Sequence, residues 1–376
     1  MNKLLIVIRN LIMIVFLVIS GFTDAKSHAN PLSESGYKAK AAYVSDQLIK
    51  SRLDNLSSVI EINYTPEVGR RIREYTVNYR VAGERILGRV DLFFPMFEEE
   101  IDKRNLPDEL KYIAVVESNL DPTAYSKAGA SGLWQFVKAT GRMKGLKIDN
   151  YIDERRDPQK STKAALEYLI DLYDEFEDWT LAMAAYNCGP GNVRKAIRRG
   201  NSRDFWEIRR FLPNETQKYV PRIIAAMYLM QYYHAHELIP ENVNEEMRNI
   251  ITINDGRSHN FSKLSKELEI PFKMLKSLNP QYKTNYFPKN SGHLNLVIPA
   301  TKYDLYLETY DKKAYKELLA QREQAEILKK KQERVRNIME TRLEYPQQLI
   351  SIIYKDLSTE NWVREIDTDA LVLSRE

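Results

Sequence analysis

The stretch Leu106–Asp121, which reads LPDELKYIAVVESNLD, decides how the middle of this 376-residue chain folds. Pro107 suits the first position of a helix, and the two acids that follow it suit the positive end of the helix dipole. The apolar spacing that follows predicts a helix, and Glu117 lies on its apolar face, seven residues after Leu110. We expect this helix to end within 118–122, which reads SNLDP.

Glu117 is the chemically unusual residue of this helix. A carboxylate on an apolar face is destabilising unless it is neutral or well paired, and burial raises its pKa. A general acid that works near neutral pH needs such a raised pKa. Periodicity alone leaves a second interpretation open, in which Glu117 is an ordinary helix-terminal side chain that points into solvent.

A loop of small residues follows this helix and leads into two aromatic residues and an amide. It reads SKAGASGLWQF over 126–136, and small residues let a backbone approach a ligand closely. Gln135 can hydrogen-bond a sugar. Trp134 either stacks on the sugar or belongs to the hydrophobic core, and the sequence does not choose between these roles.

Two later segments bring further polar side chains to helix ends. Residues 179–185 predict a buried helix, which Gly189-Pro190 cannot continue. Tyr186 and Asn187 therefore stand at a helix terminus, where a polar pair can face a cleft. Further along, Tyr219 lies in ETQKYVP and supplies a phenol that can orient a carboxylate.

Taken together, these motifs resemble the lytic murein transglycosylases that have a soluble-transglycosylase-type, goose-lysozyme-like catalytic domain. The phrases LPDELKYIAVVES, AGASGLWQF and LAMAAYNCGPGNV carry the resemblance, which covers residues 64–235. It implies a mainly α-helical fold in which Glu117 is the single catalytic acid and base. It also implies roles for five neighbours, which line the sugar-binding cleft (Ser118, Gln135), bind the N-acetylated sugar (Tyr186, Asn187) or steady the acid (Tyr219).

The activity that this resemblance implies is cleavage of the bond between N-acetylmuramic acid and N-acetylglucosamine in peptidoglycan glycan strands. The product would be a 1,6-anhydromuramoyl end, and neither a metal nor an organic cofactor is required. Two alternatives stay open. One is a water-using, lysozyme-type hydrolase with Asp121 as its second carboxylate. The other is a non-catalytic scaffold that binds the cell wall.

The predicted organisation has four parts after the first thirty residues. A charged helical region is expected over 31–105, the catalytic domain over 106–240, a small α+β module over 245–300 and a charged C-terminal region over 301–376. The module, with a strand, two helices and a strand, resembles a LysM peptidoglycan-binding module. It lacks the usual Gly-Asp-Thr-Leu phrase near its start, so the sequence leaves its glycan binding open. A single long helix is expected over 306–345.

Residues 1–25 have the features of a secretory signal peptide. Lys3 and Arg9 precede an apolar run, and small residues at the cleavage position follow it. We therefore expect export, and the family resemblance indicates the periplasm. An uncleaved N-terminus that anchors the chain to a membrane is the alternative.

Composition removes several other classes of protein. The chain has 56 Lys and Arg against 52 Asp and Glu, a net charge of +4, which disfavours sequence-specific nucleic-acid binding. Its one cysteine, Cys188, excludes an internal disulfide framework. The five histidines are scattered without an HExxH pattern, so a zinc hydrolase is not indicated. No feature of the sequence indicates an oligomeric state.

Overall fold

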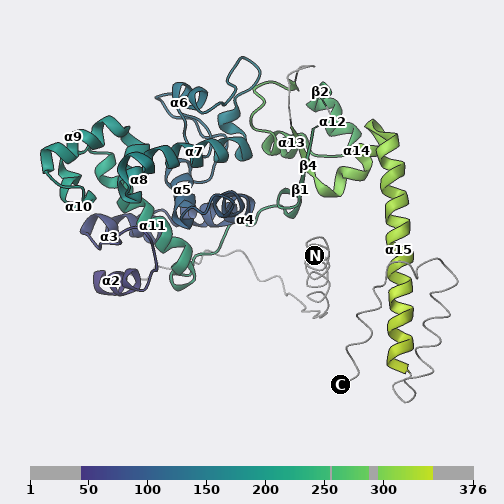
Figure 1. The fold of residues 1–376 in the computed structure, drawn as a ribbon, viewed down its shortest axis with the longest axis horizontal. Coiled ribbons are helices and arrows are strands. Elements are labelled where there is room, and N and C mark those ends of the chain that lie inside the picture. Colours follow the sequence, from purple (N-terminus) through teal and green to yellow (C-terminus); the bar gives the residue numbers. More distant parts are fainter. Residues whose placement is uncertain (1–43, 255, 288–294, 342–376) are drawn as a thin grey trace, which may run out of the picture. The chain divides into compact units, whose positions relative to one another are not determined.

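The computed structural model describes residues 44–254, 256–287 and 295–341 (Figure 1). The described chain is mainly helical, as the sequence predicts, and its named strands lie within 250–299. The predicted signal peptide, 1–25, lies outside the described residues.

The helices that precede the Glu117 motif begin with polar caps or with proline. Ser45 and Thr65 cap the first two helices by accepting hydrogen bonds from backbone N–H groups, which stabilises the first turn. The 23-residue α4 has Pro95 in its interior, a position where proline removes one backbone hydrogen bond. The elements are α2 (Asp46–Asp54), α3 (Pro66–Arg73), the π-helical turn η1 (Glu74–Asn78) and α4 (Arg80–Asp102).

The helix predicted from Pro107 onward is present but starts with a tighter turn. A 3-10 turn, η2 (Asp108–Lys111), leads into α5 (Tyr112–Ser118). Asn119, at φ 53°, takes the left-handed conformation that ends the helix. The end predicted within 118–122 is therefore confirmed, and Glu117 occupies the last turn of α5.

The helices after α5 complete the domain that holds this motif. Asp157 caps α7 and Pro158 opens it, a position that suits proline. Gly189 ends α8, and Pro190 is the first residue of the following helix. The helices are α6 (Lys138–Met143), α7 (Pro158–Phe176), α8 (Trp179–Cys188), α9 (Pro190–Gly200), α10 (Phe205–Ile208) and α11 (Tyr219–Tyr232), with 3-10 turns η3 (Glu154–Arg156), η4 (Arg209–Phe211), η5 (Thr216–Lys218) and η6 (Tyr233–His236).

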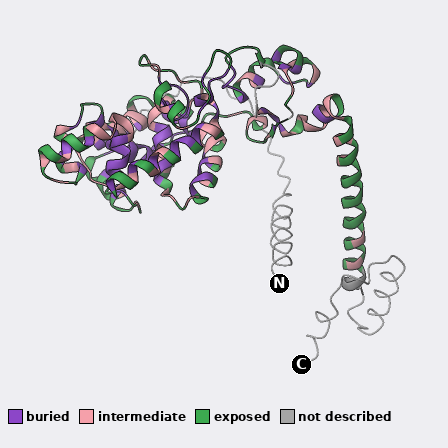
Figure 2. Cartoon of the chain, turned by 45° about the horizontal axis from the view of Figure 1, so that its top comes forward, coloured by how far each residue is buried: buried purple, intermediate pink, exposed green. Residues whose placement is uncertain are grey.

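One cluster of buried apolar side chains extends from Val44 to Leu238. It therefore includes both the predicted N-terminal region and the predicted catalytic domain. Helix α11, which packs against α3, α5 and α8, is buried along most of its length. Figure 2 shows buried residues concentrated in these helices, whereas most residues of α15 (Lys312–Thr341) are exposed.

A buried ion pair holds the small-residue loop of 126–136 in place. Arg155 donates two hydrogen bonds to Asp153, at 2.8 and 2.6 Å, and two more to the backbone carbonyls of Gly129 and Phe136. The backbone of this loop lies so close that a Cβ on Gly132 would lie 1.7 Å from the Arg155 carbonyl oxygen. With φ at +86°, only glycine suits this position.

The small α+β module has its own hydrophobic core. Strand β1 (Ile250–Ile253) pairs antiparallel with β4 (Leu296–Pro299), and β2 (His259–Asn260) pairs with β3 (Tyr286–Phe287). Helices α12 (Phe261–Glu267) and α13 (Phe272–Leu278) follow β2 and precede β3 in the sequence. The predicted order of a strand, two helices and a strand is therefore present. A short turn, η7 (Glu245–Met247), precedes the module, and another, η8 (Ala300–Lys302), follows it.

The helix expected over 306–345 is in fact two helices. Helix α14 (Tyr303–Tyr310) contributes Tyr306 and Leu307 to the core of the module, and α15 follows it. The break occurs at Asp311, which leaves helical geometry and accepts a hydrogen bond from the backbone N–H of Ala314. An aspartate in this position caps a new helix instead of continuing the old one.

Candidate active site

Glu117 lines a cavity of about 530 Å³ in the helical domain. The cavity collects side chains from the end of α5, the 126–137 loop, α6, α7, the end of α8 and the start of α11. Its lining residues are Val116, Glu117, Ser126, Ala128, Ala130, Gln135, Phe136, Val137, Thr140, Tyr168, Tyr186, Asn187, Gly189, Glu215, Tyr219 and Arg222. A cavity of this size is typical of ligand sites in proteins.

The Glu117 carboxyl group combines burial with one hydrogen-bonded side-chain partner among the described residues. The Tyr219 hydroxyl donates a 2.6 Å hydrogen bond to Glu117 Oε1. Burial raises the pKa of Glu117 to about 7, and the negative charge of Glu215 adds to this increase. The Tyr219 hydrogen bond and the positive charge of Arg222 oppose it. The carboxyl group therefore exchanges its proton near neutral pH, as a general acid and base must.

Two tyrosines near Glu117 remain protonated donors. Burial raises the pKa of both Tyr186 and Tyr219 well above the usual value for a phenol. The Tyr186 hydroxyl donates to the Trp134 carbonyl oxygen at 2.8 Å, and its ring lies 5.6 Å from that of Tyr168. Tyr186 thus forms an aromatic wall of the cavity and links the small-residue loop to α8.

Asn187 is oriented by a residue that the sequence analysis did not select. The Thr216 hydroxyl, buried at the start of η5, donates a 2.7 Å hydrogen bond to Asn187 Oδ1. Because the carbonyl end of the amide is occupied, its NH₂ end is left to donate to a ligand in the cavity. Thr216 lies in the ETQKYVP segment, but no sequence signal connects it to a residue 29 positions earlier.

Gln135 presents the carbonyl end of its amide to the cavity, whereas Asn187 presents the NH₂ end. Its Nε2 donates to the backbone carbonyls of Ala124 and Gly132, at 3.2 and 2.8 Å. Its backbone is left-handed, with φ at +48°. The carbonyl end of Gln135 and the NH₂ end of Asn187 therefore give the cavity one oriented acceptor and one oriented donor.

Ser118 and Trp134 are placed away from the cavity lining. Ser118 is buried, and its hydroxyl lies 2.9 Å from the carbonyl oxygens of both Ala114 and Leu133. Its hydroxyl joins α5 to the small-residue loop, and Ser118 is not among the side chains that line this cavity. Trp134 is fully buried and donates through Nε1 to Thr162, so it belongs to the core.

The second carboxylate in the cavity of Glu117 is not Asp121, the residue that the hydrolase alternative in the sequence analysis requires. Asp121 does not line the cavity, and it accepts hydrogen bonds from Thr123 and forms an ion pair with Arg89. Glu215 does line the cavity and is the second carboxylate there. The ETQKYVP motif contains Glu215, but the sequence analysis assigns a role only to Tyr219 of that motif.

The polar side chains of the cavity carry carboxyl, phenol, amide, hydroxyl and guanidinium groups. Burial raises the pKa of the Cys188 thiol, which keeps it in the unreactive neutral form. Among the residues that the structure describes, no group of three or more His, Cys, Asp or Glu side chains is arranged to hold a metal ion.

Comparison with known proteins gives two matching family models. Residues 94–209 match the transglycosylase SLT domain, and residues 249–315 match the LysM-like domain of lytic transglycosylase MltD. The second match extends past the predicted limit of residue 300, in agreement with the packing of α14 in the core of the module.

Individual relatives carry the same names. The chain is 47% identical over 131 residues to membrane-bound lytic murein transglycosylase D of Escherichia coli, which covers 34% of this chain and 28% of that protein. It is 30% identical over 200 residues to membrane-bound lytic murein transglycosylase F of Histophilus somni, covering 50% and 39% of the two chains. A solved structure, the 70 kDa soluble lytic transglycosylase of Escherichia coli, aligns with a TM-score of 0.34 and 22% identity over 50% of this chain and 34% of that chain.

The chain thus spans less than half the length of these curated relatives. The matches nevertheless fall on the two regions that the sequence motifs single out. The sequence-based resemblance, including that to membrane-bound lytic murein transglycosylase D, is confirmed: the chain carries a transglycosylase SLT domain followed by an MltD-type LysM-like domain.

Proposed function

We propose that this protein is a peptidoglycan lytic transglycosylase that cleaves the N-acetylmuramic acid–β-1,4–N-acetylglucosamine bond and leaves 1,6-anhydromuramoyl ends. The observation that carries the proposal is the position of Glu117, hydrogen-bonded to Tyr219 in a cavity with oriented amides and phenols, where burial raises its pKa. The SLT-domain match over 94–209 supports the same class of activity.

In the first step, protonated Glu117 donates its proton to the glycosidic oxygen. The bond from this oxygen to C1 of the muramoyl residue breaks, and the N-acetylglucosamine side leaves with its hydroxyl restored. Positive charge develops at C1. The Glu117 carboxylate formed in this step is held by the Tyr219 hydroxyl at Oε1, so the new charge keeps a hydrogen-bond donor.

In the second step, the same carboxylate acts as the base. It takes the proton from the C6 hydroxyl of the muramoyl residue, and the C6 oxygen forms a bond to C1. No water is consumed, and Glu117 returns to its protonated form. One carboxyl group can perform both steps because its pKa of about 7 lies near the working pH. Gln135, Tyr186 and Asn187 would hold the sugars around this point, and Tyr219 would steady Glu117.

A lysozyme-type hydrolase remains the second candidate because Glu215 lines the same cavity. In that mechanism Glu215 would activate a water molecule, and the products would carry ordinary reducing ends. Digestion of purified murein sacculi followed by mass spectrometry of the fragments separates the two. We expect anhydro ends, each lighter by one water than the corresponding reducing end. Reducing ends would favour the hydrolase, and a lack of soluble fragments would favour a non-catalytic scaffold.

The location and organisation of the chain form part of the same proposal. We propose export to the periplasm through the signal peptide of 1–25. In the order of the chain, the regions after this signal are the N-terminal helical, the catalytic, the LysM-like and the C-terminal regions. Within the described ranges, every helix is too short or too polar to cross a bilayer. Cell fractionation with an antibody to the intact chain tests the location, since the proposal expects the protein in the envelope fractions.

A further inference from the structure

A second cavity, of about 490 Å³, lies in the helical domain and shares no lining residue with the cavity around Glu117. It is lined by Val59, Asn105, Leu106, Pro107, Ile170, Tyr173 and Trp179. Tyr168 of α7 lines the catalytic cavity, whereas Ile170 and Tyr173 lie about 200° and 140° further around that helix. The two cavities therefore face different sides of α7.

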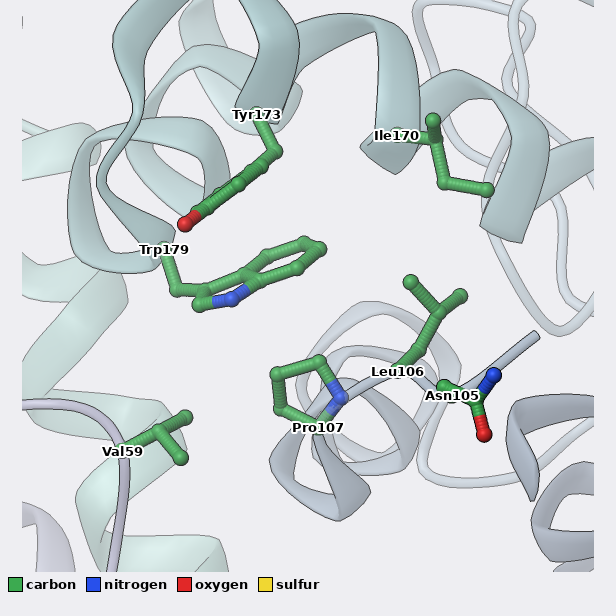
Figure 3. Close-up of a pocket in the computed structure, with 7 residues that line it drawn as sticks. All are labelled: Val59, Asn105, Leu106, Pro107, Ile170, Tyr173 and Trp179. Carbon is green, nitrogen blue, oxygen red and sulfur yellow. The ribbon is translucent and has the colours of Figure 1, made fainter.

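Trp179 is the principal side chain of this second cavity. Its indole lies against the Tyr173 ring, with centroids 4.2 Å apart and planes 21° apart. Figure 3 shows Trp179 between Tyr173 on one side and Pro107 on the other, with Leu106 and Ile170 near the edge of the indole. The stacking covers one face of the indole with the Tyr173 ring, and the indole lines the cavity together with Leu106 and Pro107, so this aromatic surface is formed before a ligand arrives.

The residues that line this cavity are uncharged, and a hydrogen bond holds part of its rim. Val59 is held at the rim because its backbone N–H donates a 2.8 Å hydrogen bond to the buried Glu109 side chain. None of the seven lining residues carries a formal charge. Asn105, exposed and with φ at +51°, supplies an amide at the rim. Among the described residues, the Trp179 ring N–H and the Tyr173 hydroxyl form no hydrogen bond, so they are available to a ligand.

We propose that this cavity is a second saccharide-binding site, which holds a neutral N-acetylhexosamine unit of a glycan strand outside the cleavage cavity. An aromatic platform suits the apolar face of a pyranose, and a few amide, hydroxyl and indole groups suit its hydroxyl and acetamido groups. The absence of charge among the lining residues disfavours the peptide stems of peptidoglycan, which carry carboxylates. The proposal rests on the proposed function only for the source of the glycan.

Fluorine NMR of the intact chain labelled with 5-fluorotryptophan tests the site directly. The probe is tri-N-acetylchitotriose, an uncharged saccharide, added to the Glu117→Gln variant so that nothing is cleaved. We expect the resonance assigned to Trp179 to shift in a saturable manner, while that of Trp206, which lies outside both cavities, stays in place. A Trp179 resonance that does not move up to millimolar saccharide would overturn the proposal.

A pair of matched surface variants provides the second test. Val59→Arg fills the rim of the cavity from a residue that is 61% exposed, and Val81→Arg adds the same charge at a residue that is 67% exposed and lines neither cavity. We expect Val59→Arg to weaken the saccharide-induced Trp179 shift at least tenfold and Val81→Arg to leave it within twofold. Equal behaviour of the two variants would contradict the proposal.

Asn105→Gly separates this site from the proposed activity. Glycine accepts the left-handed backbone at this position, so the variant removes the amide without strain. We expect weaker saccharide binding at Trp179 but unchanged cleavage of short soluble glycan fragments. If the Asn105→Gly variant binds the saccharide more weakly but still forms anhydro products, the result supports the second site. If the parent protein itself forms no anhydro products, that result counts against the proposed function alone.

Discussion

Asp153 and Glu117 are both acids held inside the same helical domain, yet the protein treats their charges in opposite ways. Burial alone would raise the pKa of Asp153, but two hydrogen bonds and the charge of Arg155 hold that pKa below its usual range. Glu117 receives one hydrogen bond from a neutral phenol, and its pKa rises to about 7. A buried acid that is hydrogen-bonded to a cation serves structure, whereas one that is hydrogen-bonded to a neutral phenol is available for proton transfer.

The largest effect is expected for Glu117→Gln, which removes the catalytic side of the contrast between Glu117 and Asp153. Glutamine keeps the shape of the side chain but cannot give up and recover a proton. We expect the rate of murein cleavage to fall on the order of 10³-fold, with the far-ultraviolet circular dichroism spectrum unchanged. Turnover measured on purified sacculi checks this. Near-normal turnover of a folded variant would show that the proton comes from another group.

On the structural side of the comparison, Asp153→Asn removes the charge that pairs with Arg155, whose side chain is 1% exposed. An unpaired buried charge destabilises a fold by about 3–5 kcal/mol. We therefore expect the free energy of unfolding in urea to fall by about that amount. Asp171→Asn is the control, because the Asp171 side chain in the Lys144 ion pair is 59% exposed and such pairs contribute about 1 kcal/mol or less. Similar losses in both variants would contradict this assignment.

Tyr219→Phe tests how the neutral phenol beside Glu117 sets the pKa of that carboxyl group. The Tyr219 hydrogen bond lowers the pKa of Glu117, so its removal should raise that pKa further. Because the acid works in its protonated form, the alkaline limb of the pH–rate profile should move to higher pH. We also expect a drop of about tenfold to a hundredfold in kcat, since the carboxylate of the second step loses its donor.

The matched control for this change is Tyr232→Phe, on the same helix. The Tyr232 hydroxyl donates to the Arg52 carbonyl, away from the cavity. This variant should leave the pH–rate profile in place. A shift of equal size in both variants would mean that Tyr219 acts through the packing of α11 and not through Glu117.

Thr216→Val has the smallest expected effect because Thr216 acts through Asn187. Losing its 2.7 Å hydrogen bond frees the Asn187 amide to rotate, which costs about 1 kcal/mol of sugar binding. We expect KM to rise about fivefold with kcat nearly unchanged, and Thr216→Ser to restore KM. A fall in kcat that Thr216→Ser does not restore would point to a packing defect instead.

Much of the fold could be predicted from the sequence because its signals are local. Pro107, Asp157 and the apolar spacing before Glu117 are features of single helices, and the structure has those helices. The break at Asp311 was equally local but was hidden by the continuous charge pattern around it. The bond of the Ser118 hydroxyl to Leu133 could not be predicted, because periodicity does not tell which of two adjacent residues turns toward a cavity and which toward the neighbouring loop.

The remaining features depend on contacts between distant parts of the chain. Thr216 meets Asn187 across 29 positions, and Arg155 reaches Gly129 across 26. The second cavity joins Val59, Pro107 and Trp179 from three segments. No spacing rule within a helix or strand connects such residues, so they emerge only when the packing of the loops and turns around α8 is known.

The most direct test of the account is the titration of the Glu117 carboxyl group itself. Carbon NMR of the chain labelled at glutamate side-chain carboxyl carbons, with Glu117→Gln to assign the resonance, follows that group through the pH range. The account predicts a midpoint at about pH 7, with the proton held below it and lost above it. A midpoint near the ordinary glutamate value of 4.5 would leave the group ionised at neutral pH and would contradict its role as the acid.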